Sequence, residues 1–128
     1  MKIEDVKKMT KDKLRIKAAI LGGWSELEGV GKYPRGLPPC WSEGTRPKCD
    51  VPDYPNDIAA AWELIDDLLD RCDNQISIEI YYDLRNEWTC SVYCSECWID
   101  LEDKKPARAI TMAYIVARDR LEADQTVE

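Results

Sequence analysis

The clearest hydrophobic pattern in the chain lies within residues 54–72. Apolar residues recur there every three or four positions, as they do on the buried face of a helix; they are Ile58, Ala61, Trp62, Ile65, Leu68, Leu69 and Cys72. Asn56 is the predicted N-cap, and Asp57 follows where a negative charge meets the positive end of the helix dipole. The side facing water carries Glu63, Asp66, Asp67 and Asp70. The pattern predicts a central helix against which the other elements pack.

Alternating patterns after this helix predict three strands. Residues 76–82 and 88–93 alternate between apolar and polar side chains with the period of a half-buried strand. Residues 84–87 form a predicted turn between them, and residues 97–101 form a third strand after a tight turn near Ser95. Because the connections are short, the three strands are expected to form an antiparallel meander.

Two more helices are predicted on either side of this unit. Thr10 is the predicted N-cap of the first, which runs through Leu21 and stops at Gly22 and Gly23. Pro106 suits the first turn of the last helix, whose apolar positions are Ile110, Ala113, Tyr114, Ala117 and Leu121. The elements together predict an α+β protein.

Residues 27–55 differ in character, because six of the seven prolines lie there among several glycines. Long regular elements are improbable in such a segment, although short strands fit around Lys32 and Tyr33 and around Trp41. The 128 residues are most simply one domain. Within it, residues 27–55 form a Pro-rich loop insertion that covers something, and residues 123–128 form a flexible tail.

Composition narrows the function. The net charge of −7 argues against binding to a nucleic-acid polymer, which needs many Lys and Arg contacts to phosphate, but a few arginines in a pocket still suit a small anion. The chain has no histidine, which removes the commonest general base. It has no predicted membrane span and no signal-peptide core, so we expect a cytoplasmic protein with free thiols among its six cysteines.

Cysteines and carboxylates offer two further chemistries. Cys90, Cys94 and Cys97 have a spacing that permits part of a zinc site, but buried or loop cysteines explain them more simply. The paired carboxylates lie where a helix or strand faces water, so a solvated surface is favoured over a catalytic dyad. No nucleophile elbow, P-loop or dinucleotide fingerprint is present. We therefore predict no enzymatic activity, no metal and no cofactor.

The more informative set combines aromatic rings with guanidinium groups. Tyr82, Arg85, Asn86 and Trp88 lie at one predicted sheet end, Arg108 lies in the first turn of the last helix, and Arg118 lies about three turns further along. A nucleotide is recognised by a ring for stacking, a guanidinium for phosphate and an amide for a base edge. The alternative is that Trp88 is a core residue and that the arginines only solubilise the surface.

Five short sequence segments, in this order, resemble the phage ABA-sandwich domain family. They are Gly23 with Trp24, GLPP at residues 36–39, DIAAAWELIDDL at 57–68, WTC at 88–90 and PARAITMAY at 106–114. The resemblance spans roughly residues 10 to 120. It implies a helix, antiparallel sheet and helix sandwich, the ABA arrangement.

The family is also similar to the first type of Thoeris anti-defence protein, so the resemblance implies a function. Such a phage protein is an oligomeric sponge that sequesters cyclic ADP-ribose isomers made by bacterial TIR-domain enzymes, and in some cases cyclic oligonucleotides, without cleaving them. Ligand contacts are then expected from the sheet end and the start of the last helix, which points to Asn86, Trp88 and Arg108, and further to Tyr82, Arg85 and Arg118.

A sponge of this kind implies a homo-oligomer built from dimers, most simply a hexamer, in the cytoplasm of an infected bacterial host. We expect the Ala59 to Ala61 face or the last helix at a subunit contact. The rival hypothesis is a phage structural or interaction module that docks on a host protein, and a zinc-binding regulator is third.

Overall fold

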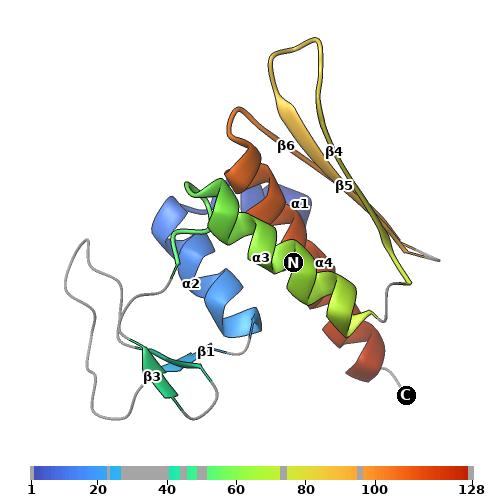
Figure 1. Cartoon of the computed structure of the whole chain (residues 1–128). Helices are drawn as coiled ribbons and strands as arrows, with labels where there is room; N and C mark the ends of the chain where they lie inside the picture. Colours follow the sequence, from blue (N-terminus) through green and yellow to red (C-terminus); the bar gives the residue numbers. More distant parts are fainter. Residues whose placement is uncertain are drawn as a thin grey trace.

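The computed structural model describes residues 2–22, 24–26, 41–43, 46–48, 52–72, 75–94 and 97–126. In chain order the elements are α1 (Ile3–Lys7), α2 (Lys11–Leu21), β1 (Trp24–Glu26), β2 (Trp41–Glu43), β3 (Arg46–Lys48), α3 (Ile58–Arg71), β4 (Ser77–Tyr82), β5 (Trp88–Cys94), β6 (Cys97–Asp103) and α4 (Pro106–Thr126). The α+β class is confirmed: helices pack against a three-stranded antiparallel sheet (Figure 1). In the part of the chain that is described, no helix combines the length and apolar character needed to cross a bilayer.

The antiparallel meander predicted from the alternating pattern is confirmed. The strand order is β4-β5-β6, with Ile80 opposite Cys90 and Cys90 opposite Leu101. These three side chains therefore lie on one face of the sheet, and Cys90 and Leu101 are buried there. The other face exposes Tyr81 and Trp98. A second, small sheet has the order β1-β2-β3; the predicted strand around Trp41 is confirmed, whereas the one around Lys32 and Tyr33 lies outside the described residues.

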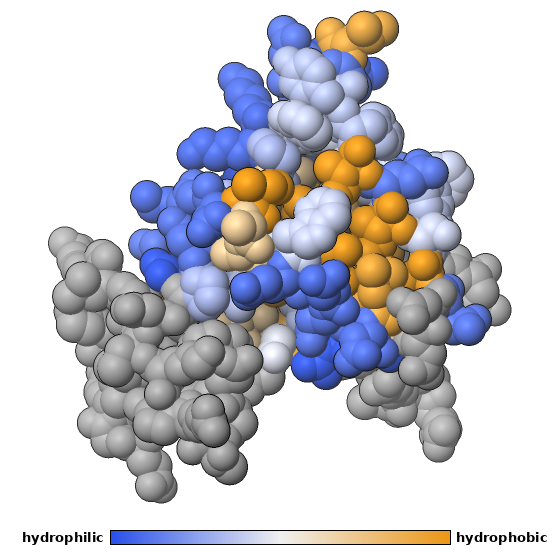
Figure 2. Space-filling view, in the orientation of Figure 1, coloured by the Kyte–Doolittle hydropathy of each residue, from blue (hydrophilic) through white to orange (hydrophobic). Residues whose placement is uncertain are grey.

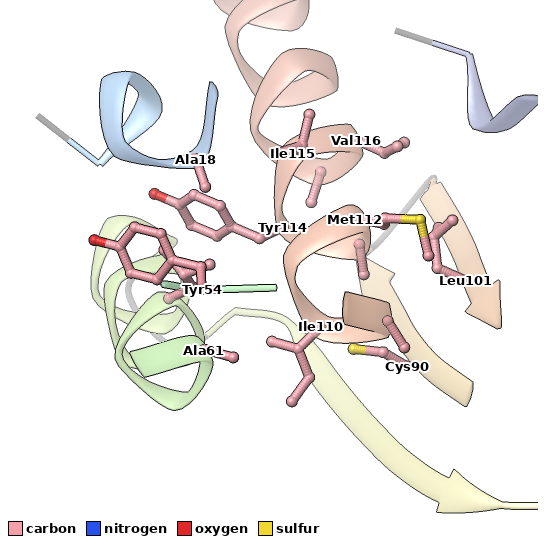
Figure 3. Packing of buried hydrophobic residues seen from close by; sticks show 14 of the residues in the cluster. Ala18, Tyr54, Ala61, Cys90, Leu101, Ile110, Met112, Tyr114, Ile115 and Val116 are labelled. Atoms are coloured by element: carbon pink, nitrogen blue, oxygen red, sulfur yellow. The ribbon is translucent and has the colours of Figure 1, made fainter. Parts of the chain in front are cut away.

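The element at the centre of the molecule is α4, so the prediction that residues 54–72 form the central helix was wrong. One side of α4 packs on β5 and β6, and its other sides contact α3, α2 and α1. In Figure 3, Tyr114 points toward Ala18 of α2, while Met112 points toward Leu101 of β6. All the side chains from Ala109 to Arg118 are buried. Ala109, Ala113 and Ala117 are small enough to let neighbouring elements approach closely.

The helix at residues 54–72 forms, but its N-cap and buried face differ from the prediction. The N-cap is Asp57, not Asn56, because the Asp57 carboxylate accepts a hydrogen bond of 3.0 Å from the amide of Ala59. Ile58 and Trp62 were predicted to be buried, yet they are 48% and 52% exposed. The reason is that α3 packs on α4 rather than on the sheet, so its buried face is the one shared by Ala60, Ala61, Leu64, Ile65 and Leu68.

The first predicted helix is confirmed with both of its ends. α2 begins after Thr10, whose hydroxyl accepts a 3.3 Å hydrogen bond from the Lys13 amide, and ends at Gly22. The shorter α1 before it was not predicted. At the other end of the chain, α4 begins at Pro106 as expected but continues to Thr126, so residues 123–126, assigned to a flexible tail by the sequence, are helical.

The surfaces predicted to hold subunits together are used inside the chain. Ala60 is 8% exposed and Ala61 is fully buried, both against the chain's own core. The middle of α4 is equally enclosed. Ala59 and the start of α4 are less enclosed, so only the buried parts of these two surfaces are occupied within the chain.

Candidate functional site

Three helices begin at one polar cleft. Lys11 is the first residue of α2, Asn56 lies two residues before α3, and Lys105 immediately precedes α4. The cleft is open to solvent and has a volume of about 460 Å³. Its walls are formed by Lys11, Asn56, Glu87, Glu102, Asp103, Lys104, Lys105 and Arg108. Because each helix start carries partial positive charge, the three starts add to the charge of the four basic side chains.

Arg108 is the predicted site residue that lies in the cleft. Its side chain is 21% exposed, and its Nε forms an ion pair of 3.3 Å with Asp103. Its Nη2 donates to the carbonyl of Met9 at 2.9 Å and to that of Lys7 at 3.4 Å. These bonds tie the first turn of α4 to the connection between α1 and α2. The Nη1 group, which carries two N–H donors, makes no hydrogen bond to any residue in the described part of the chain.

The neighbouring lysines are differently engaged. The Lys105 ammonium donates to the side-chain oxygen of Asn56 at 3.3 Å, which joins the starts of α3 and α4. The backbone amide of Lys105 donates to Asp103 at 2.9 Å. Lys11 and Lys104 form no ion pair with any other described residue. Lysines at helix starts are electrostatically unfavourable, because the dipole there prefers negative charge. An anion in the cleft would relieve that repulsion.

An aromatic pair stands on the β4–β5 hairpin, which also contributes Glu87 to the cleft. The ring centroids of Tyr82 and Trp88 are 5.3 Å apart, with the planes tilted by 57°. Trp88 is opposite Asp103 in the sheet register, and its neighbour Glu87 lines the cleft. The Tyr82 hydroxyl donates to the Asn86 side chain at 3.0 Å. Three of the six predicted site residues, Tyr82, Asn86 and Trp88, therefore lie together on one hairpin. Trp88 is opposite Asp103, which forms the ion pair with Arg108.

The turn that carries this pair is set by local chemistry. The Asp83 carboxylate accepts hydrogen bonds from the amides of Arg85 at 2.8 Å and Glu87 at 3.2 Å. Asn86 has a φ of 61°, a left-handed conformation that Asn tolerates better than most residues. Arg85 is exposed in this turn, beside the aromatic pair.

Arg118, the last predicted site residue, lies away from the cleft in a buried network. Its Nη1 donates to the Leu21 carbonyl at 2.6 Å, to the Tyr114 hydroxyl at 3.0 Å and to Asp67 at 3.3 Å. Arg118 is only 6% exposed. Burial and the hydrogen bond with Asp67 raise the pKa of Tyr114 well above its usual range, so this phenol stays protonated. The group joins α2, α3 and α4, and it has the geometry of a structural network.

Cys90 occupies the core rather than a reactive site. It is 2% exposed, and burial, with a smaller effect from Asp100, raises the pKa of its thiol to about 12. The thiolate that a metal or an electrophile would need is therefore disfavoured at neutral pH. Within the described residues, no group of three or more Cys, Asp or Glu side chains could hold a metal ion.

Of the residues that line or adjoin this cleft, the sequence predicted Arg108 and the aromatic pair as candidates, but not Lys11, Asn56, Lys104 or Lys105. A local signal did exist, since Lys104 and Lys105 stand directly before Pro106, where acidic residues are the usual choice. No signal in the local sequence indicates that α2 and α3 begin at the same cleft as α4. Comparison of the chain with family models, with curated proteins and with solved structures finds no match.

Proposed function

We propose that the protein binds a small anionic nucleotide in the cleft and holds it without chemical change. The observation that carries this proposal is the convergence of three helix starts on one cleft: Lys11 comes from the start of α2, Asn56 from that of α3, and Lys105 and Arg108 from that of α4. The Tyr82–Trp88 pair lies on the hairpin whose residue Glu87 also lines the cleft. Phosphate groups fit lysine ammonium groups, a guanidinium and helix amides. The rings offer a surface on which a base can stack.

The carboxylates of the cleft fit the same ligand class. Glu87 and Glu102 line the cleft together with the basic side chains. A bare anion would be repelled by them, whereas the hydroxyls of a ribose are natural donors to carboxylates. The mixture of both charges beside aromatic rings therefore favours a nucleotide over an inorganic anion.

The physiological role that we propose is sequestration of a cyclic nucleotide immune signal by a phage anti-defence protein, with cyclic ADP-ribose isomers as the leading ligands and cyclic oligonucleotides as a further class. Capture works by mass action and requires Kd values on the order of nanomolar, or about 12 kcal/mol. Such affinity for a small ligand needs nearly complete burial. Because the cleft of one chain is open, a neighbouring subunit would have to close it.

The assembly is part of the same proposal. A homo-oligomer built from dimers, such as a hexamer, would supply the closing surface. The finer ABA arrangement is also proposed here, because α4 covers one face of the β4-β5-β6 sheet while the other exposes Tyr81 and Trp98. Helices from another subunit would complete the sandwich.

Thermal unfolding in the presence of cyclic ADP-ribose isomers and of cyclic di- and trinucleotides tests this function. A ligand at 100 times its Kd should stabilise the protein by about 2.7 kcal/mol and raise Tm by several degrees. Mass spectrometry of the recovered ligand should find it unchanged. Lys105→Ala should remove most of the rise in Tm, because this side chain lines the cleft.

The matched control is Lys2→Ala, which removes an exposed lysine that does not line the cleft. It should keep the full ligand effect. A Tm that no nucleotide changes, or an equal loss of the effect in both variants, would refute nucleotide binding at the cleft.

Docking on a host protein is the second candidate function. The exposed rings of Trp98 and Tyr81 favour it, since one open sheet face presents both. Unchanged Tm with every nucleotide, together with loss of host-protein binding on Trp98→Ala, would support this reading.

A further inference from the structure

Strand β4 leaves one edge of the main sheet open. It pairs with β5 only, and no other described residue pairs with its outer edge. Natural sheets protect such an edge with charged side chains, most often lysine, or with proline, a bulge or a cover. The strand SIEIYY contains neither proline nor lysine, and Glu79 is its one charged residue; its alternating pattern is that of a strand that can pair further.

The register shows which backbone groups point outward. At the hairpin end, the Asp83 amide donates to the Glu87 carbonyl at 2.9 Å, so residues 83 and 87 form a hydrogen-bonded pair. In an antiparallel ladder such pairs alternate. Glu79 and Tyr81 therefore bond to β5, and the N–H and C=O groups of Ile78, Ile80 and Tyr82 face the open edge.

The apolar side of β4 is also incompletely covered. α4 packs on β5 and β6, and α3 packs on α4, so Ile78 and Ile80 stay only partly buried although they face the helices. On α3, Ile58 and Trp62 are about half exposed. A small apolar pocket of about 10 Å³, lined in part by Leu64, Ile65 and Ile78, lies where α3 approaches the sheet. Figure 2 shows apolar surface gathered over this region.

We propose that two copies of this chain pair through their β4 strands, antiparallel and around a two-fold axis normal to the sheet. The result is a continuous six-stranded sheet with the helices of both copies on the same side of it. This two-fold pairing covers both the open edge and the apolar side of β4. The outward backbone groups gain hydrogen-bond partners, and the apolar side chains gain neighbours from the second copy. An isologous contact of this kind closes on itself, which protects the edge from open-ended association.

Charge selects the register. Pairing that uses the full strand can be centred on Glu79 or on Ile80. Centring on Glu79 sets it opposite Glu79 of the partner subunit, and like charges directly opposite each other are destabilising. Centring on Ile80 sets Glu79 opposite Tyr81 of the partner subunit, and Ile78 opposite the partner's Tyr82. The second register is therefore the one that we assign.

This dimer deepens the assembly part of the proposed function. It places Tyr82, one ring of the Tyr82–Trp88 pair, at the subunit boundary. The dimer is tested by the molar mass of the ligand-free protein in solution. A protein that fails to dimerise can therefore be told apart from one that fails to bind nucleotides.

The test compares two substitutions at one exposed position, Tyr81, in sedimentation or light scattering. The wild-type chain should have twice its monomer mass of 14.7 kDa. Tyr81→Glu sets a second carboxylate opposite Glu79 at two symmetric places and should raise the dimer Kd at least about tenfold. Tyr81→Lys removes the same ring but gives an attractive pair, so it should keep the dimer. The double variant Glu79→Lys with Tyr81→Glu restores opposite charges and should recover dimerisation.

Lys8→Gln controls for net charge, because it also makes the chain more negative by one unit but lies directly after α1, and it should not weaken the dimer. Amide exchange gives an independent readout: β4 should be protected in the wild-type dimer and lose protection in Tyr81→Glu, while β5 stays protected. A wild-type chain that is monomeric at about 100 μM, well above a micromolar Kd, overturns the proposal. So does a Tyr81→Glu variant that dimerises like wild type, or a double variant that fails to recover.

Discussion

Tyr114 in the middle of α4 donates a hydrogen bond to the Asp67 carboxylate of α3, and this carboxylate also accepts from Arg71 at 2.8 Å and from Arg118 at 3.3 Å. Three donors therefore meet on one oxygen of Asp67. Because Arg118 also donates to the carbonyl of Leu21 at the end of α2, the network fixes the relative positions of three helices. The same three helices begin at the candidate cleft, so the network also holds the geometry of that cleft.

Removing the Asp67 carboxylate should therefore cost more stability than removing the phenol. Asp67→Ala leaves the nearly buried Arg118 guanidinium without its carboxylate and should lower the free energy of unfolding by about 2–4 kcal/mol, since Asp67 itself is partly solvated. Tyr114→Phe removes one hydrogen bond and should cost about 1–2 kcal/mol. Urea unfolding measures both. Asp66→Ala, at an exposed neighbouring position, should change the free energy by less than about 0.5 kcal/mol; an equal loss there would contradict a specific role for Asp67.

The thiol of Cys90 should make stability fall at alkaline pH. Burial raises its pKa to about 12 in the folded chain, above the value of an exposed thiol. Between pH 9 and 12 the unfolded chain then binds fewer protons than the folded chain, so the free energy of unfolding falls as pH rises, by up to about 1.4 kcal/mol per pH unit. The stabilisation that the protonated Cys90 thiol provides is fully present below pH 9. Denaturant unfolding at several pH values measures the slope.

Cys90→Ala should reduce that slope, whatever its effect on stability at neutral pH. Cys72→Ala is the matched control, because Cys72 is only partly buried, and it should leave the slope nearly unchanged. An identical slope in wild type and Cys90→Ala would show that other groups, such as the buried Tyr114 phenol, dominate the alkaline loss.

The identity of the α3 N-cap can be checked by two neighbouring substitutions. Asp57→Ala removes the carboxylate that accepts from the Ala59 amide and should lower the free energy of unfolding by about 1 kcal/mol. Asn56→Ala removes an exposed side chain that bonds to Lys105 and Asp53, and it should cost less than about 0.5 kcal/mol. Thermal or urea unfolding compares them, and the reverse order would assign the cap to Asn56.

Two substitutions of Asn86 test separately the backbone geometry of the hairpin turn and the hydrogen bond that holds the Tyr82 ring. Because its φ is 61°, Asn86→Ala should lower the free energy of unfolding by about 1 kcal/mol, whereas Asn86→Gly should fold about as well as wild type. Both substitutions remove the acceptor of the Tyr82 hydroxyl. If the cleft binds nucleotides, Asn86→Gly should reduce the ligand-induced rise in Tm while leaving the Tm of the free protein unchanged. Full ligand protection in Asn86→Gly would show that the Tyr82–Asn86 bond does not matter for binding.

Local patterns in the sequence were sufficient to predict the helices α2, α3 and α4 and the three strands of the main sheet, although not α1 or β1. Thr10 and Gly22 delimit α2, Pro106 opens α4, and period-two alternation defines the strands, because each of these signals acts through neighbouring backbone groups or through the face on which a side chain must lie. The Tyr82, Asn86 and Trp88 group was predictable for the same reason, since a single hairpin carries all three. These features need no knowledge of where distant segments pack.

Tertiary structure alone decided which helix is central and which charges meet. α3 and α4 both carry wide apolar surfaces, and only the packing of α4 between the sheet and the other helices leaves Ile58 and Trp62 of α3 exposed. Arg108 and Arg118 have the same chemistry and the same helix, yet one lines the cleft and the other is enclosed by α2 and α3. The physical reason is that burial and electrostatic neighbourhood depend on contacts between segments far apart in the chain, which no local spacing encodes.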